Sequence, residues 1–297
     1  MQPYGRTKFL AILEATFAVV VWGGSFVATK VALKEVSPVT VVWLRFAMGV
    51  VIIGLSVMIR KQWARPARKD LLYFALLGFL GISFHQWLQS TGLLTAQATT
   101  TAWIVATTPI FMAVLGWVVL KERLNWIQVG GIGIAACGVL LVVTKGNHLS
   151  ISPGKFGTPG DFLILISALN WAVFSAFSRR GLQEYPAARM MFFVMAFGWL
   201  FVSILFFTSD GLSQIANLTR QGWTGILFLG VLCSGVAYIF WYDALQVLPV
   251  AQTGAFVYLE PFITVIVAAI VLDEQLIAAS LFGGAAILLG VWLVNRN

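Results

Sequence analysis

The sequence has few charged residues. Asp, Glu, Lys and Arg make up 10% of its 297 residues, whereas an average soluble domain has roughly 25%. The mean hydropathy is +0.91. These values exclude an ordinary soluble protein and predict a chain that crosses a membrane several times. The net charge of +8 does not indicate nucleic-acid binding, because the basic residues stand in short loops between apolar segments.

Residues for enzymatic or metal chemistry are also scarce. The only histidines are His85 and His148, and both cysteines, Cys137 and Cys233, lie inside apolar segments. This disfavours an intramembrane enzyme, a metal cluster and a disulfide. The sequence contains no GxxxxGK[ST] phosphate loop, the usual sign of ATP hydrolysis. We therefore predict a protein that is not an enzyme and has no cofactor and no metal.

What the sequence has in abundance is long hydrophobic runs. About 20 apolar residues are enough for a helix to cross a bilayer, and ten such segments predict an all-α integral membrane protein with ten transmembrane helices. They are residues 9–29, 38–59, 71–93, 97–119, 124–144, 161–180, 187–208, 222–245, 250–272 and 276–295.

The last quarter of each half of the chain repeats itself. Residues 98–142 align with 250–294 at a constant offset of 152, and 12 of the 45 pairs are identical, more than the roughly one in ten expected from composition. The identical pairs include Pro109 with Pro261, Glu122 with Glu274, Gly131 with Gly283 and Gly138 with Gly290.

The loop inside this repeat changes its charge. It reads Lys121-Glu122-Arg123 in the first copy and Asp273-Glu274-Gln275 in the second. Because basic loops stay in the cytoplasm, the change predicts that the same helical hairpin is inserted twice, in opposite orientations. Inverted repeats of this kind are typical of transporters.

Two repeats of five helices explain the inversion, because an odd number of helices reverses the second copy. We predict a first repeat over residues 1–145, a linker loop over 146–160 and a second, inverted repeat over 161–297. The loops that this topology places in the cytoplasm hold 13 Lys and Arg residues, and the opposite loops hold 5. This bias predicts a multi-pass protein of the plasma (inner) membrane with both termini in the cytoplasm.

The two hairpins resemble the paired EamA repeat of the drug/metabolite transporter (DMT) superfamily, in which a mid-helix Pro precedes an acidic hairpin and a glycine-bearing last helix. The stretch Trp22-Gly23-Gly24-Ser25-Phe26 is similar to the opening motif of that family. Within the superfamily the chain resembles the YddG-type exporters of aromatic and other amino acids. The resemblance implies two inverted repeats around a central cavity lined mainly by helices 1, 3, 4, 6, 8 and 9, and export without ATP.

Polar and aromatic residues in these helices are the candidates for substrate contact. His85 and Gln89 follow helical spacing and put an imidazole and an amide on one face; interhelical hydrogen bonding is an equally good interpretation. Aromatic rings accept flat side chains and can hold an ammonium group, although many Trp residues serve as interface anchors or in packing. The candidate cavity residues are Trp22, Ser25, His85, Gln89, Trp103, Thr107, Asn170, Trp171, Tyr238 and Tyr258.

Charged residues and prolines inside the membrane form a second group of candidates. Glu260 stands in mid-helix before Pro261, whose counterpart in the first copy is Pro109. A charge at the bilayer centre costs at least about 2.5–3.5 kcal/mol, so Glu260 should face protein or water. It either binds protons or a substrate ammonium, or braces the kink at Pro261, and the bracing role is favoured. Arg45 and Asp243 are interpreted as structural.

These observations predict a secondary transporter that exports small zwitterionic solutes, amino acids including aromatic ones, by alternating access. The alternative is a carrier of drugs, nucleotide sugars or other metabolites on the same fold. A strongly anionic substrate would need several intramembrane cations, and only Arg45 is available. The expected partners are the small-molecule substrate and the lipid bilayer, without nucleic acid. The choice between monomer and homodimer, and the coupling ion, stay open.

Overall fold

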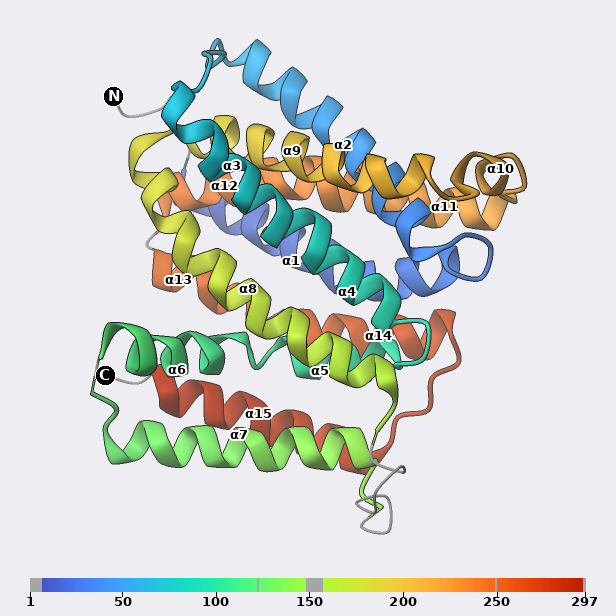
Figure 1. Ribbon diagram of the computed structural model, residues 1–297. Coiled ribbons are helices and arrows are strands. Elements are labelled where there is room, and N and C mark those ends of the chain that lie inside the picture. Colours follow the sequence, from blue (N-terminus) through green and yellow to red (C-terminus); the bar gives the residue numbers. More distant parts are fainter. Residues whose placement is uncertain (1–6, 122, 148–156, 249, 296–297) are drawn as a thin grey trace.

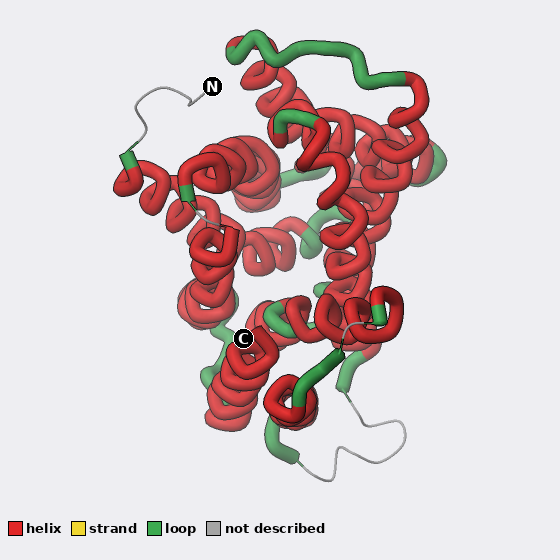
Figure 2. Tube along the Cα trace, turned by 90° about the vertical axis from the view of Figure 1, so that its left-hand side faces the viewer, coloured by secondary structure: helices red, strands yellow, loops and turns green. Residues whose placement is uncertain are grey.

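The computed structural model describes residues 7–121, 123–147, 157–248 and 250–295 (Figure 1). Nearly all of these residues are helical, and no strand occurs among them (Figure 2). Two residues named above, Glu122 and His148, lie outside the described residues, as does most of the expected linker 146–160.

Ten helical segments of the described chain are long and apolar enough to cross a membrane, which confirms the predicted all-α membrane fold. The uninterrupted segments are α1 (Lys8–Ala32), α2 (Pro38–Ile59), α7 (Trp126–Thr144), α8 (Pro159–Glu184), α9 (Ala187–Phe207) and α15 (Ala278–Asn295). The short helix α10 (Gly211–Ala216) follows α9.

The other four segments are interrupted. The third contains η1 (Arg68–Asp70), α3 (Leu71–Gly78), η2 (Phe79–Phe84) and α4 (His85–Gly92), and the fourth contains α5 (Ala98–Val105) and α6 (Thr108–Leu120). The eighth contains α11 (Arg220–Leu227), η4 (Phe228–Val236) and α12 (Ala237–Val247), and the ninth contains α13 (Val250–Phe256), η5 (Val257–Leu259) and α14 (Glu260–Val271).

The interruptions fall at equivalent places in the two halves. Pro109 and Pro261 stand in the first turns of α6 and α14, where a missing N–H is tolerated and the preceding turn cannot continue as a regular helix. Segments η2 and η4 are π-helical, a rare geometry that is frequent at functional sites. Their first residues are 149 apart (228 − 79), the offset that also relates Trp22 to Trp171 (171 − 22).

Local sequence explains where several helices begin. Ser37 Oγ accepts from the Thr40 N–H, and Pro38 occupies the first position of α2. Capping boxes start α7 and α8: Asn125 pairs with Gln128, and Thr158 pairs with Asp161. Such caps satisfy the N–H groups that a helix start leaves without partners.

The repeated hairpins pack against each other through α7 and α15, which lie side by side at the lower edge of Figure 1. A Cβ atom on Gly131 would lie 2.8 Å from the Gly290 carbonyl oxygen, and one on Gly138 would lie 2.6 Å from that of Gly283. The numbering rises along one helix as it falls along the other, so the two helices are antiparallel. Since α7 and α15 are equivalent in the repeat, the two halves are inverted.

The two halves are interleaved over the rest of the molecule. Helix α2 packs on α9 and η4, and α1 packs on α12 and α14. In a bilayer the lipid tails are as apolar as leucine, so close packing, more than escape from water, holds such helices together. The position of each helix therefore depends on partners from the other half.

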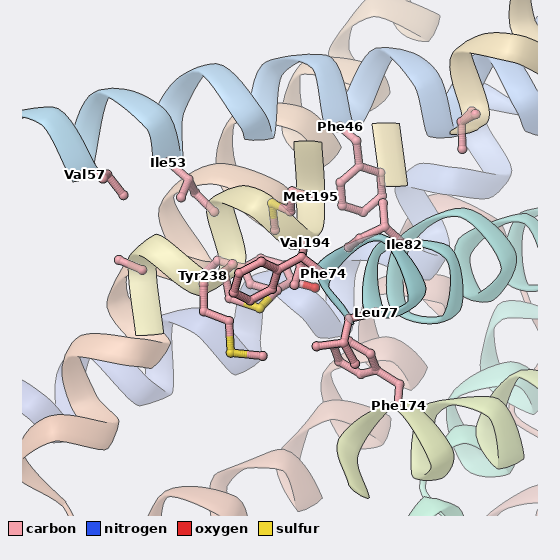
Figure 3. Packing of buried hydrophobic residues seen from close by; sticks show 14 of the residues in the cluster. Phe46, Ile53, Val57, Phe74, Leu77, Ile82, Phe174, Val194, Met195 and Tyr238 are labelled. Carbon is pink, nitrogen blue, oxygen red and sulfur yellow. The ribbon is translucent and has the colours of Figure 1, made fainter. Parts of the chain in front are cut away.

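The largest buried cluster joins α2, α3 and α9, and Phe174 and Tyr238 reach it from α8 and α12 (Figure 3). Its fully buried side chains include Phe46, Phe74 and Met195. On the outside, large apolar residues such as Leu72 and Phe282 stay exposed, as expected for a surface that faces lipid. Trp22, Trp171 and Tyr242 pack along the inner edge of the cluster.

Candidate functional site

An aromatic group surrounds Trp22 in the middle of α1. Its ring lies 5.2 Å from Trp241 and 5.4 Å from Tyr238, measured between ring centroids, and meets Tyr238 edge to face. The indole Nε1–H donates to the Cys233 carbonyl oxygen in η4 at 3.1 Å. This bond fixes the orientation of the indole, which keeps part of its surface accessible.

The neighbouring glycines explain the motif Trp22-Gly23-Gly24-Ser25. A Cβ atom on Gly23 would lie 2.7 Å from Ile263 Cβ and 2.9 Å from the Glu260 carbonyl oxygen. The Thr264 hydroxyl donates to the Gly23 carbonyl oxygen at 2.7 Å. The motif therefore brings α1 directly onto the first turn of α14, beside Pro261.

A second aromatic group forms around His85 and Trp171. Their rings lie 4.7 Å apart, and Trp171 also contacts Phe174 at 4.8 Å. His85 Nδ1 lies 3.2 Å from the Ser167 carbonyl oxygen. Because a carbonyl can only accept, Nδ1 carries the proton, and Nε2 of the neutral ring is left as an acceptor. Tyr238 belongs to the buried cluster of Figure 3, and Trp22 and Trp171 both pack against that cluster.

Two of the predicted polar residues have side chains without a hydrogen-bond partner among the described residues. Gln89 is buried, Ser25 is partly accessible, and neither side chain has a hydrogen bond to any described residue. An amide left without a partner in the membrane is unfavourable unless a ligand or water satisfies it. Gln89 is therefore the clearest candidate for direct substrate contact in α4.

Two other predicted residues already serve the scaffold. Asn170 donates to the Leu80 carbonyl oxygen at 2.7 Å, which lies in the π-helical segment η2. The Thr107 hydroxyl donates to the Ile104 carbonyl oxygen at 2.6 Å, at the break between α5 and α6. Both side chains satisfy carbonyl groups at irregular turns.

Trp103 and Tyr258 lie in a different cluster from the two aromatic groups. Trp103 is 1% exposed, and its ring lies directly on Gly284 of α15. Phe262 meets the indole edge to face at 5.6 Å. The Tyr258 hydroxyl accepts from Asn295 at 3.1 Å. These two residues thus belong to a different cluster from Trp22 and Trp171, and the buried Trp103 indole N–H has no hydrogen-bond partner among the described residues.

Among the described residues, Glu260 has no side-chain partner of the kind that a bracing role needs. Its side chain is partly accessible, and no described residue forms a hydrogen bond or ion pair with its carboxyl group. Its backbone carbonyl oxygen accepts from the Thr264 hydroxyl at 3.0 Å. Its charge acts on Tyr238 and Cys233, so the carboxyl group lies near the group around Trp22.

The ion pairs of the buried acids were not predicted. Arg60 holds Asp243 through two hydrogen bonds, of 2.5 and 2.7 Å, and this bonding raises the pKa of the Arg60 guanidinium. Asp70 accepts from Arg180 at 3.2 Å and from the Tyr185 hydroxyl at 2.6 Å. The partners are more than 100 residues apart, and no sequence pattern connects them. No group of three or more potential metal ligands occurs within the described ranges.

Comparison with known proteins places this arrangement in context. The sequence model of the EamA-like transporter family matches residues 9–144 and 158–296. The chain is 27% identical over 285 residues to an uncharacterized transporter of Archaeoglobus fulgidus, covering 96% of this chain and 97% of that one. It is 27% identical over 294 residues to a probable terminal-alkyne amino-acid exporter of Streptantibioticus cattleyicolor, covering 97% and 94%. A solved crystal structure superposes with a TM-score of 0.68 at 18% identity, over 96% of this chain and 97% of the other, which shows a shared fold.

Proposed function

Since this chain belongs to the EamA-like transporter family, we propose that it is a secondary transporter that exports small zwitterionic solutes, above all amino acids including aromatic ones. The observation that carries the proposal is the pair of aromatic groups, around Trp22 and around His85, that pack against one buried cluster. The Gln89 amide, one turn from His85, and the Glu260 carboxyl group have no hydrogen bond to any described residue. Aromatic faces suit apolar side chains and ammonium groups. The relative described as a probable amino-acid exporter supports the same substrate class.

In this proposal Glu260 binds the substrate ammonium group or a coupling proton. A carboxyl group without an internal partner at membrane depth is a functional candidate by its chemistry. The absence of hydrogen bonds from described residues favours this role over bracing of the kink.

Alternating access would use the interruptions in the third, fourth, eighth and ninth membrane segments. Regular helices are stiff, whereas a break at Pro109 or Pro261 leaves backbone groups free to exchange partners. Broken helices in matching positions of inverted repeats are the usual sites of substrate binding and rearrangement in secondary transporters.

We further propose a plasma (inner) membrane location with both termini in the cytoplasm, and repeats bounded at residues 145 and 161. Single cysteines at Arg123 and Gln275, in a chain without Cys137 and Cys233, test the orientation by labelling from each side. We expect position 123 to react from the cytoplasmic side and position 275 from the opposite side. Reaction of both from one side would contradict the proposed topology.

The alternative, a carrier of drugs, nucleotide sugars or other metabolites, differs in its demand for charge. A nucleotide sugar carries two phosphates and needs several cations, whereas a cationic drug needs none. Purified protein in liposomes, given labelled amino acids, nucleotide sugars and cationic dyes in parallel, separates these substrates. We expect uptake of amino acids alone, and uptake of another class without amino acids would overturn the proposed function.

A further inference from the structure

Arg45 is a buried cation that no carboxylate of the described chain neutralises. It lies in α2 with 5% of its surface exposed. Its Nε donates to the Ser234 hydroxyl at 3.0 Å, and its Nη1 donates to Gln86 Oε1 at 2.9 Å. Both acceptors are neutral, and no carboxylate among the described residues pairs with this guanidinium. A guanidinium has five N–H donors, and Nη2 has no hydrogen-bond partner among these residues.

An unpaired buried charge such as Arg45 differs from two buried acids of this fold, which form ion pairs. Buried Asp243 is paired with Arg60, and buried Asp70 is paired with Arg180. An isolated buried charge is strongly unfavourable, because hydration is lost and no opposite charge replaces it. Arg45 would therefore be stabilised by an anion that the described part of the chain does not supply.

The surroundings of Arg45 are built to hold the guanidinium in one place. Gly49 lies one turn further along the same face of α2, and a Cβ atom there would be 2.9 Å from Ser234 Cβ. This close approach brings Arg45 within reach of the Ser234 hydroxyl. Ser234 lies in the π-helical segment η4 of the second half, and Gln86 lies in the first turn of α4, just beyond the equivalent segment η2.

The cation also lies beside both aromatic groups. Its partner Gln86 follows His85 in the chain, and its partner Ser234 follows Cys233, whose carbonyl oxygen accepts from Trp22. A solute bound against these groups would present its own anion to Nη2.

We propose that Arg45 binds the carboxylate of the transported solute, while Gln86 and Ser234 hold the guanidinium in position for it. This inference rests on the proposed function and narrows it to solutes with a free carboxylate. The planar fork of arginine suits a carboxylate because it offers two parallel donors. The reading of Arg45 as a purely structural residue would then be incomplete.

The test replaces the neutral partner with an acid of the same shape. In Gln86→Glu the new carboxylate lies where Gln86 Oε1 now accepts from Arg45, so it neutralises the cation from within the protein. We expect the variant to insert normally and to unfold at the same or a higher temperature. Its KM for phenylalanine should rise by about 10-fold or more, the loss expected when a charge-assisted hydrogen bond is removed. Unchanged transport in Gln86→Glu would overturn the proposal.

The matched control is Gln221→Glu, the same chemical change at an exposed residue in the first turn of α11. This variant should transport phenylalanine as the unaltered protein does. If it loses transport equally, the effect of Gln86→Glu is not specific to Arg45, and the proposal fails.

A second measurement needs no variant, and so remains decisive if Gln86→Glu does not fold. Unaltered protein in liposomes is offered labelled phenylalanine and its carboxamide, which keeps the ring and the ammonium group but has no carboxylate. We expect at least about a 10-fold preference for phenylalanine. Equal transport of both overturns the role of Arg45 but leaves the proposed function intact. Transport of no amino acid contradicts the proposed function, and the assignment of Arg45 with it.

Discussion

The carboxylate of Glu274 caps the helix that begins at Ala98. Its two oxygens accept from the backbone N–H groups of Ala98 and Thr99, at 2.8 and 3.0 Å. Glu274 belongs to the hairpin of the second half, whereas α5 belongs to the first, so this cap joins the halves. Lys30 lies near enough for the charge of Glu274 to act on it, and its Nζ donates to the Ala96 carbonyl oxygen at 2.5 Å.

We predict that Glu274→Ala destabilises the protein by about 1.5–3 kcal/mol, because two charge-assisted hydrogen bonds are lost at the start of a short helix. Glu274→Gln should lose less, since the amide oxygen can still accept one of them. Thermal unfolding in detergent measures the difference. Equal stability of the Ala variant and the unaltered protein would show that the cap contributes little.

The contact between α7 and α15 gives a prediction with an internal control. A Cβ atom at position 138 would lie 2.6 Å from the Gly283 carbonyl oxygen and 2.9 Å from Ile287, whereas a Cβ atom at position 133 would have no atom within 4 Å. Gly138→Val should destabilise by about 1–3 kcal/mol through overpacking. Gly133→Val should stay close to the unaltered protein, although both changes introduce the same β-branched side chain. Similar unfolding temperatures for the two variants would contradict this helix contact.

We expect alanine at Gln89 to impair transport and alanine at Trp103 to impair stability. Gln89→Ala removes an uncommitted amide, so we expect normal membrane abundance and reduced transport. Trp103→Ala leaves a cavity against Gly284 and should cost about 3–5 kcal/mol of stability, with low abundance as the result. Trp126, at 89% exposed, serves as the control for loss of an indole. A Trp103→Ala variant that is abundant in the membrane but inactive would instead indicate that Trp103 contacts the substrate.

Glu260→Gln separates the two roles considered for the intramembrane carboxyl group. The amide keeps the shape of the side chain but loses charge and titration. We expect a well-inserted protein that has lost most of its transport, because no bracing partner exists among the described residues. Glu184→Gln, at the exposed end of α8, is the control and should remain active. Substantial transport by Glu260→Gln would restore the bracing role.

The helix count and the repeat could be predicted because both leave clear patterns in the sequence of a membrane protein. Long apolar segments give the helix count, and the offset between residues 98–142 and 250–294 reveals the repeat. The four glycines of that alignment meet in space with their partners exchanged, Gly131 on Gly290 and Gly138 on Gly283, because the equivalent helices are antiparallel. The repeat therefore identified the residues that meet where α7 and α15 cross.

The site was harder to predict because it depends on partners from distant parts of the chain. A periodic stripe identified His85 and Gln89, but nothing local distinguished the packed Trp103 from the partly accessible Trp22. The pairing of Asp243 with Arg60, 183 residues away, and the neutral surroundings of Arg45 appear only when α2, η4 and α4 come together. Aromatic residues are common both in lipid-facing and in binding positions, so composition alone could not separate them.

The central claim is that this protein moves amino acids without ATP, and counterflow tests it most directly. Liposomes that contain the purified protein are loaded with unlabelled phenylalanine and diluted into a trace of the labelled amino acid. A secondary transporter exchanges the two, so the label should accumulate transiently above its outside concentration, in the absence of nucleotide. Accumulation no greater than in protein-free liposomes, from correctly inserted protein and with every amino acid tried, would contradict the account.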